Sequence, residues 1–180
     1  MKELALHLLD LMQNSLRAGA TTINLTIQES ISQNIFKIRL QDNGKGMNED
    51  MVKGVINPFV TSRTHRKVGL GIPFMAQMCR ECEGELKIQS KEQVGTEVVA
   101  TLQYDHIDRL PLGDIAETVA TLIMARPDVR YIYRHEYETE GFMLDTEDIK
   151  QRLEGVPIED LEIIAWLKDY MREGIKVLTK

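Results

Sequence analysis

Residues 42–47 constrain the fold of this chain more than any other stretch of its sequence. They read Asp-Asn-Gly-Lys-Gly-Met and directly follow a strand-like alternation of Phe36, Ile38 and Leu40 with polar residues. The two glycines allow a sharp turn and a close approach of another backbone or of a ligand. Asp, Asn and Gly also fill ordinary turns after strands. The segment therefore marks a strand end that is either a plain turn or one wall of a binding site.

The first 104 residues show helical and strand-like periods in turn. Apolar residues at spacings of three and four predict helices, and apolar residues at every second position predict strands with one buried face. Residues 56–70 follow neither period, and a loop of that length inside a compact domain is typically a functional lid or a disordered segment. The predicted elements are helices at residues 3–18, 48–55 and from Gly69 to Cys79, and strands at residues 23–27, 36–40, 86–88 and 98–102.

The character of the sequence changes near residue 105. Prolines separate the later segments, as is usual at breaks between elements. We therefore expect a domain of residues 1–104 followed by a small α/β extension of residues 105–180. In that extension the pattern predicts helices at residues 113–125, 146–153 and 158–178 and a strand pair at residues 129–137 and 141–144.

Composition and charge exclude several classes of protein. With 43% hydrophobic and 28% charged residues, the 180-residue chain is typical of a globular protein. Its formal net charge of −6 argues against a broad nucleic-acid surface, which needs an excess of basic charge. The apolar run at the N-terminus is broken by His7, Asp10 and Gln13, and no stretch approaches the roughly 20 apolar residues of a membrane helix. We therefore expect a cytoplasmic protein that binds neither nucleic acid nor membrane.

Asp10 and Asn14 form a candidate pair on the first predicted helix. They are four residues apart, so their side chains share one face. That face is either the solvent side of an amphipathic helix or one side of a pocket. In a pocket, the carboxylate would polarise an attacking hydroxyl or water, and the amide oxygen would ligate Mg²⁺.

Asp42 is a candidate acceptor for a nucleotide base. A buried carboxylate accepts a hydrogen bond from the exocyclic amine of adenine, and Gly44 and Gly46 would let the backbone approach the base. Guanine would present a carbonyl oxygen to the same carboxylate, so repulsion as well as attraction would select adenine.

The start of the helix at Gly69-Leu70-Gly71 is a candidate anion site. Free N–H groups and the positive end of the helix dipole attract phosphate there, and glycine permits close approach. The preceding segment contributes Arg63, Arg66 and Lys67, which are either phosphate ligands or part of a solvated basic loop.

The order of these segments over residues 3–104 resembles the ATP-binding domain of the GHKL superfamily, named for gyrase, the heat-shock chaperone, histidine kinases and the mismatch-repair ATPase. The stretch QNSLRAGATTINLTI is similar to the mismatch-repair ATPase. The stretches NPFVTSR, VGLGIPFM and GELKIQSKEQVGTEVVATL are more similar to histidine kinases and anti-sigma-factor kinases. The resemblance implies an α+β fold, a two-layer α/β sandwich with a mixed, mostly antiparallel sheet (the Bergerat fold), to which the C-terminal extension is added.

The resemblance also implies roles for individual residues. Asp10 would be the catalytic residue, at a position where many members have the longer Glu. Asn14 would hold Mg²⁺ and contact ATP, Asp42 would bind the adenine, and Thr96 would join the adenine network. The other implied ATP contacts are Arg17, Gly44, Gly46, Met47, Arg63, Gly69, Leu70, Gly71 and Ile72.

Three functions remain open at this point. The resemblance implies first a signalling phosphotransferase that passes the γ-phosphate of ATP to a Ser, Thr or His on a partner protein. The shorter Asp10 and the extension suit a second function, an ATP-driven conformational switch or slow ATPase without phosphoryl transfer. The third is a DNA-repair-like ATPase, against which the acidic balance counts. No phosphoacceptor motif is found, since His7 is not followed by an acidic residue and Arg-x-Pro.

The last predicted helix carries two apolar stripes. One domain core comfortably occupies one of them. The second stripe includes Trp166 and Tyr170, residue types favoured at protein contacts. A homodimer contact and a helix buried on both sides are both compatible with this pattern.

Overall fold

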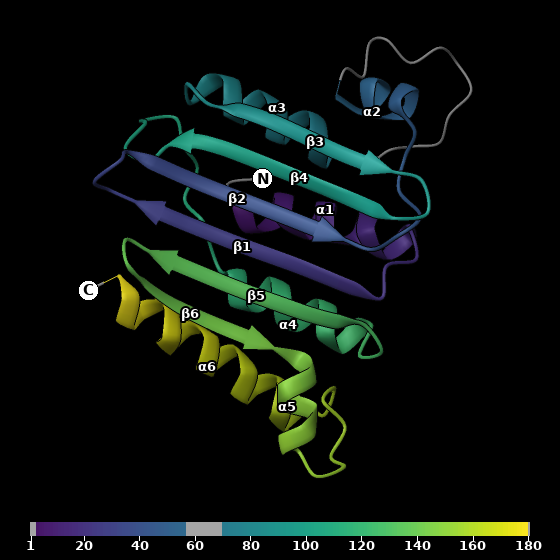
Figure 1. The fold of residues 1–180 in the computed structure, drawn as a ribbon. Coiled ribbons are helices and arrows are strands. Elements are labelled where there is room, and N and C mark those ends of the chain that lie inside the picture. The colour runs from purple at the N-terminus through teal and green to yellow at the C-terminus, as the bar shows by residue number, and fades with distance from the viewer. Residues whose placement is uncertain (1–2, 57–69, 180) are drawn as a thin grey trace.

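The computed structural model describes residues 3–56 and 70–179, which form one six-stranded sheet with helices (Figure 1). The strand order is β3-β4-β2-β1-β5-β6. The pairing of β1 with β5 is parallel, and the other four pairings are antiparallel. The mixed, mostly antiparallel sheet that the sequence predicted is thereby confirmed. The strands are β1 (Thr22–Ser30), β2 (Ile35–Asp42), β3 (Glu85–Lys91), β4 (Gly95–Gln103), β5 (Arg130–Tyr137) and β6 (Glu140–Asp145).

The helices form the second layer. In Figure 1, α1, α3 and α4 lie behind the sheet and α6 runs alongside β6. Contacts between α1 and α3, between α1 and α4, and between α4 and α6 make this layer continuous. The helices are α1 (Leu4–Arg17), α2 (Glu49–Ile56), α3 (Gly71–Glu81), α4 (Ile115–Ala125), α5 (Thr146–Arg152) and α6 (Leu161–Leu178).

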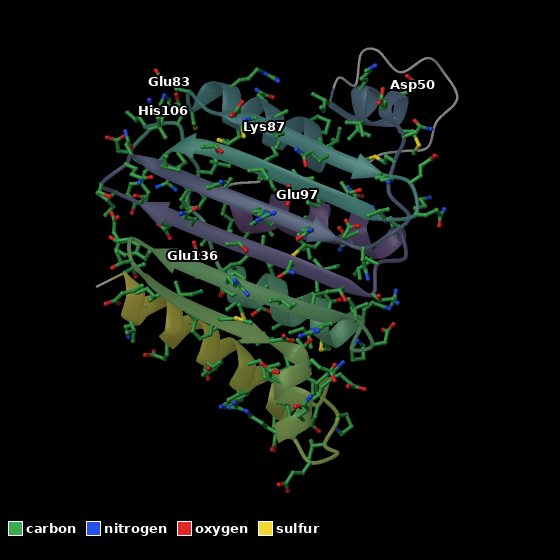
Figure 2. All side chains as sticks on the ribbon, viewed as in Figure 1. Asp50, Glu83, Lys87, Glu97, His106 and Glu136 are labelled. Atoms are coloured by element: carbon green, nitrogen blue, oxygen red, sulfur yellow. The ribbon has the colours of Figure 1, made fainter. Side chains whose placement is uncertain are left out.

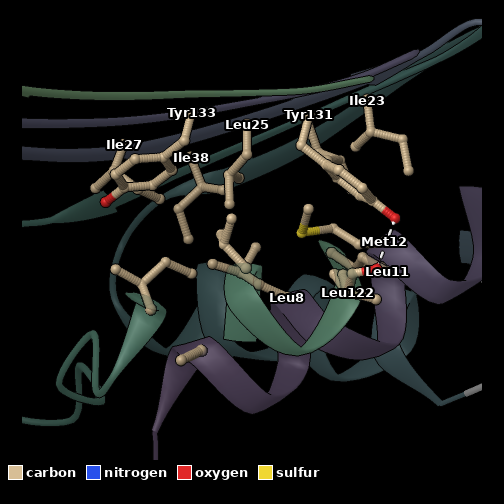
Figure 3. Close-up of a cluster of buried hydrophobic side chains, with 14 of the residues drawn as sticks. Leu8, Leu11, Met12, Ile23, Leu25, Ile27, Ile38, Leu122, Tyr131 and Tyr133 are labelled. Atoms are coloured by element: carbon tan, nitrogen blue, oxygen red, sulfur yellow. Dashed lines mark hydrogen bonds between the residues drawn. The ribbon is translucent and has the colours of Figure 1, made fainter. Parts of the chain in front are cut away.

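The core lies between the sheet and the helices (Figure 3). The alternation that predicted β1 places Ile23, Leu25 and Ile27 on the helix side, where each is at most 1% exposed. Leu8 and Met12 of α1 meet them from below. Full burial of such a side chain contributes about 1.5–3 kcal/mol, so this layer of contacts fixes α1 against the sheet.

The C-terminal residues extend the same sheet. Thr22 of β1 lies beside Arg130 of β5, and the parallel register continues along both strands. The strand pair that the sequence predicted at residues 129–137 and 141–144 therefore forms and extends the sheet. The predicted domain limit at residue 105 falls between β4 and α4, and strands on both sides of it belong to one sheet. A separate domain of residues 105–180 stays a prediction.

The segment before α4 also supports the start of α1. The backbone N–H groups of Leu4 and Ala5 donate to the carbonyl oxygens of Pro111 (2.9 Å) and Leu112 (2.8 Å). The hydroxyl of Thr118 in α4 donates to the carbonyl oxygen of Ala5. The first turn of a helix leaves amide donors without intrahelical partners, and here the chain after residue 105 satisfies two of them.

The other face of the sheet is polar. Lys87, Glu97 and Glu136 lie on the side turned away from the helices (Figure 2). Arg39 donates to Glu97 across the β2–β4 pair at 2.6 Å. This face is therefore solvated, and the candidate site lies between the sheet and the helix layer.

Candidate functional site

The polar stripe of α1 carries the first three candidate residues. Asp10, Asn14 and Arg17 lie on one face of the helix, as their spacing predicted. Arg17 donates to the Asn14 side-chain oxygen at 3.0 Å. The Asn14 amide nitrogen is buried and has no hydrogen-bond partner among the described residues. An unsatisfied buried donor is costly, so this side chain is suited to receive a ligand.

Asp42 ends β2 and is held by two donors. The Ser15 hydroxyl donates to one carboxylate oxygen at 2.5 Å, and the Gly44 N–H donates to the other at 2.9 Å. These two hydrogen bonds fix the direction of the carboxylate. Ser15 was not predicted as a site residue; its adjacency to Asn14 gave no signal, because serine is common in helices and turns alike.

Thr96 lies opposite Asp42 in the β2–β4 pair. Its hydroxyl is 2.8 Å from that of Ser90, which accepts from the Met47 N–H at 2.8 Å and donates to the Gly95 carbonyl oxygen at 3.0 Å. Thr96 and Met47 were both predicted at the site, and Ser90 was not. The structure thus joins the start of β4 to the segment after β2 through one hydroxyl.

The segment after β2 is clamped from two sides. The Lys45 N–H donates to the Ala18 carbonyl oxygen, and the Lys45 carbonyl oxygen accepts from Gln93 at 2.7 Å. Gly46 has φ of 66°, and a Cβ there would lie 2.0 Å from the carbonyl oxygen of Lys91. Close backbone packing alone therefore requires this glycine. The predicted contact of Gly44 and Gly46 with a base stays a prediction.

The start of α3 meets α1 at Asp10. A Cβ on Gly71 would lie 3.1 Å from the Asp10 Cβ, so the two helices touch at this point. Leu70 precedes the helix and gives it no side-chain cap. Ile72 is buried, whereas Leu70 is exposed. The start of α3 therefore lies beside Asp10, and its first amide groups receive no side-chain cap from Leu70.

Two predicted ATP contacts cannot be placed. Arg63 and Gly69 fall within residues 57–69, which lie outside the described residues, as does most of the predicted lid at 56–70. The short helix predicted at residues 48–55 is confirmed as α2, and the Asn48 side-chain oxygen caps it by accepting from the Met51 N–H at 3.0 Å.

The arrangement defines a class of protein. The fixed carboxylate of Asp42 lies at the Ser15 end of α1. The uncapped start of α3 lies beside Asp10, one to two turns of α1 away. Such a pair suits a ligand with an amine-bearing ring and an anionic tail, which is the chemistry of a nucleotide. Residues 2–106 match the family described as histidine kinase-, DNA gyrase B-, and HSP90-like ATPase, and the chain belongs to this family.

Curated relatives include both kinases and repair proteins. The chain is 30% identical over 93 residues to a putative sensor protein of Shewanella frigidimarina, covering 51% of this chain and 14% of that protein. It is 28% identical over 99 residues to sporulation kinase C of Bacillus subtilis, covering 54% and 23%. It is 26% identical over 168 residues to the DNA mismatch repair protein MutL of Geobacillus kaustophilus, covering 72% and 26%. The chain thus spans about a quarter or less of each of these relatives.

Solved structures share the fold. The Aquifex aeolicus MutL ATPase domain complexed with ADP aligns with a TM-score of 0.50 at 20% identity, covering 86% of this chain and 68% of that one. The N-terminal domain of a DNA repair protein aligns with a TM-score of 0.53 at 10% identity, covering 79% and 52%. These likenesses confirm the predicted α+β sandwich.

A second surface feature lies on α6. The rings of Trp166 and Tyr170 stack with centroids 5.1 Å apart, and the two side chains are 49% and 44% exposed. Ile164, Leu167 and Met171 of the same helix are buried in the core. Burial of α6 on both sides is therefore wrong for the isolated chain.

Within residues 3–56 and 70–179, no helix is long and apolar enough to cross a membrane.

Proposed function

We propose that this chain binds ATP with Mg²⁺ and acts as a signalling phosphotransferase, passing the γ-phosphate to a Ser, Thr or His on a partner protein. The contact between Asp10 and Gly71 is the observation that carries the proposal. It places the Asp10 β-carbon beside the start of α3, whose first amides have no side-chain cap, so a general base and phosphate-binding donors would belong to one site.

The adenine end of the proposed site is built around Asp42. Its carboxylate would accept from the exocyclic amine of the base, with Thr96 beside it on the next strand. Ser15 and Gly44 donate to the same carboxylate and hold it in place. A guanine carbonyl would meet this acceptor unfavourably, so selectivity for adenine is part of the proposal.

Asn14 fits the proposed role of magnesium ligand. Magnesium prefers oxygen ligands and is commonly held by one or two protein groups together with phosphate oxygens. No group of three His, Cys, Asp or Glu that could hold a metal exists in the described part of the chain. A magnesium site made of the single Asn14 amide oxygen and the phosphates of ATP would not require such a group. Arg17, which now donates to this oxygen, would turn to a phosphate.

Asp10 would act as general base. Its carboxylate would take the proton from the attacking hydroxyl of the acceptor, or from water in hydrolysis. The uncapped amides at Gly71 and Ile72 would donate to the phosphate oxygens, where negative charge is greatest. A Cβ at Gly71 would lie 3.1 Å from the Asp10 Cβ, so a side chain there would press on Asp10.

A conformational switch without phosphoryl transfer is a second candidate. It is favoured by the position of α1, which contacts α3 on one side and α4 on the other. The first turn of α1 also donates to Pro111 and Leu112, so movement of α1 would reach the C-terminal residues. A repair-like ATPase is a third candidate, supported by the likeness to MutL and opposed by the net charge of −6.

The candidates differ in where the γ-phosphate goes. Purified protein incubated with γ-labelled ATP and candidate partner proteins would label a partner if it is a phosphotransferase, and the Asp10→Asn variant would not. Release of labelled phosphate without a labelled protein supports the slow ATPase. Retention of intact ATP, with a changed partner affinity, supports the switch.

The stacked Trp166 and Tyr170 on α6 are the basis of a separate proposal, which concerns dimerisation. We propose that they form a homodimer contact, because they are two half-exposed aromatic rings on one helix face, and aromatic residues are enriched at protein contacts. Ile163 and Val177 lie on the same side of α6, at helical spacing from this pair.

A further inference from the structure

Ser90 lies in a polar row that crosses the sheet and ends at Asp42. In the strand register, Ser90 of β3 is the partner of Thr96 of β4, and Thr96 is the partner of Asp42 of β2. These three strands lie side by side in the sheet (Figure 1). Directly opposite residues point to the same face, with Cβ atoms about 4.5–5.5 Å apart. The three side chains therefore share one level and one face of the sheet.

The shared face is the one that the helices cover. Val98 and Ala100 follow Thr96 on this face of β4, and both are buried in the core. Thr96 and Asp42 are only partly buried, although they lie on the same side of the sheet. The helix layer therefore leaves the polar row accessible at this end of the sheet, where a ligand can contact it.

Three neighbours surround the Ser90 hydroxyl, and two of them fix the direction of its proton. The Met47 N–H can only donate, and it lies 2.8 Å from the Ser90 oxygen. The Gly95 carbonyl oxygen can only accept, at 3.0 Å. Serine has a single hydroxyl proton, which is therefore directed at Gly95. The third neighbour, the Thr96 hydroxyl at 2.8 Å, can then form its hydrogen bond only by donating to Ser90.

This assignment leaves Thr96 without a proton to offer to a ligand. Its hydroxyl oxygen keeps a lone pair and acts towards a ligand only as an acceptor. Among the described residues, Ser90 is the one side chain that hydrogen-bonds to the Thr96 hydroxyl. The Asp42 carboxylate opposite Thr96 also accepts its hydrogen bonds, from Ser15 and Gly44. Two neighbouring strands thus present acceptors at one level, which suits an amine with two N–H donors.

We propose that Ser90 is a positioning residue that sets the base selectivity of the site through Thr96. Because Ser90 holds the Thr96 proton, this hydroxyl cannot turn to donate to a carbonyl oxygen at position 6 of a purine. Adenine has an amine at that position, whereas guanine and hypoxanthine have a carbonyl oxygen, which is left without a donor. This inference rests on the proposed ATP site and extends it to a residue that need not touch the nucleotide.

Calorimetry with ATP and ITP, each with Mg²⁺, tests the inference. ITP has a carbonyl oxygen in place of the amine and an additional proton on N1, so the ratio of the two affinities is compared between proteins. We expect Ser90→Ala to lower the preference for ATP over ITP about tenfold, because the released Thr96 proton can then be donated to the carbonyl oxygen. Loss of the Met47 contact alone would weaken both nucleotides alike and leave the ratio unchanged.

Three further variants separate the Ser90 hydroxyl from a general effect on the sheet. Ser90→Thr keeps a hydroxyl and should retain the wild-type ratio. Ser30→Ala removes a hydroxyl at the end of β1 far from Asp42 and, as the matched control, should leave the ratio unchanged. In a Thr96→Val background no hydroxyl remains to be turned, so Ser90→Ala should then have no further effect on the ratio.

Neutron diffraction from crystals of the unaltered, deuterium-exchanged protein locates the protons themselves. We expect the Ser90 deuteron to point at the Gly95 carbonyl oxygen and the Thr96 deuteron to point at Ser90. A Ser90 deuteron that points at Thr96 overturns the inference. This measurement requires no variant, so it decides even if Ser90→Ala fails to fold.

The outcomes distinguish this inference from the function on which it rests. If the wild type prefers ATP and Ser90→Ala leaves the ratio of affinities as it was, the inference is wrong and the ATP site stands. If the wild type binds ITP as tightly as ATP, the adenine assignment and the inference are both wrong. If neither nucleotide binds to the wild type, the proposed ATP site itself is wrong.

Discussion

The Ser15 hydroxyl and the Asp42 carboxylate lie 2.5 Å apart, which ties the candidate site helix to the end of β2. The two residues are 27 positions apart in the chain. Their hydrogen bond fixes the end of β2, where we propose that the base binds, relative to the α1 stripe of Asp10 and Asn14. It also means that a change at Asp42 acts on α1 as well as on a ligand.

Replacing Asp42 by Asn should weaken ATP binding by about 1–3 kcal/mol. The amide nitrogen would face the amine of adenine or one of the two donors, Ser15 and Gly44, that now point at the carboxylate. Calorimetry with ATP and GTP measures this. Asp105→Asn, which removes an exposed carboxylate elsewhere, is the matched control. Equal affinity for ATP and GTP, or an unaffected Asp42→Asn variant, would contradict the adenine assignment.

Turnover should depend on the length of residue 10. Asp10 is one methylene shorter than Glu, and a displacement of about 1 Å can cost on the order of 100-fold in rate. We expect slow hydrolysis by the wild type, faster hydrolysis by Asp10→Glu, and none by Asp10→Asn. Nucleotide affinity should change little in Asp10→Asn. Rapid hydrolysis that survives this substitution would remove Asp10 from the mechanism.

Lowering the pH should remove the contribution of Asp145 to the stability of the folded protein. The Arg130 guanidinium donates to both carboxylate oxygens, at 3.0 and 2.6 Å, and holds the pKa of Asp145 below its usual value. A lowered folded-state pKa contributes stability above the unfolded value of about 3.9, and this is lost as pH falls through the folded value. Asp145→Asn should therefore cost about 1–2 kcal/mol at pH 7, since Arg130 is partly exposed and solvent screens the pair. The cost should fall as the pH drops through the lowered folded-state pKa of Asp145.

The pair of Arg126 and Asp128 is the control for this experiment. It has the same two-point geometry, at 3.0 and 2.8 Å, but its carboxylate is exposed. Urea unfolding of Asp128→Asn should show a smaller effect than Asp145→Asn at pH 7. Equal effects would show that burial of Asp145 adds nothing. Asparagine remains a good N-cap, so the capping of α5 by residue 145 is kept in the variant.

Sedimentation should show a dimer that depends on α6. The double substitution of Trp166 and Tyr170 by Glu would place charge on the stacked pair and should give a folded monomer. Lys168→Glu, on the side of α6 that faces Glu117, controls for added negative charge. A wild type that sediments as a monomer at all concentrations rejects the dimer contact.

Local periodicity predicted most elements because burial follows it. The alternation of Ile23, Leu25 and Ile27 identified β1, and the same alternation places Glu29 on the buried side. A buried carboxylate was not foreseen, because its partner is distant in sequence. His135 of β5 lies 2.7 Å from Glu29 and 2.7 Å from the Tyr133 hydroxyl. The sequence does not indicate this contact between His135 and Glu29, because the two residues become neighbours only when β5 pairs with β1.

The candidate site residues were predictable where their positions depend only on residues nearby in the sequence. Asp10 and Asn14 share a face because of helical spacing, and Asp42 ends a strand. Ser15 and Ser90 were missed, since their roles depend on which strands and helices become neighbours. A single sequence shows which side of a strand is buried but does not show which strand lies beside it.

The two hydrogen bonds from Leu4 and Ala5 to Pro111 and Leu112 make the candidate site helix dependent on residues far beyond its own motif. A fragment ending at residue 104 would match the family and still lack the acceptors that anchor the first turn of α1. It would also present β1 as a bare sheet edge where β5 now pairs. Nucleotide affinities measured on such a fragment would therefore describe a protein in which the first turn of α1 is not anchored. Domain limits drawn from sequence matching would remove residues that hold the candidate site in place.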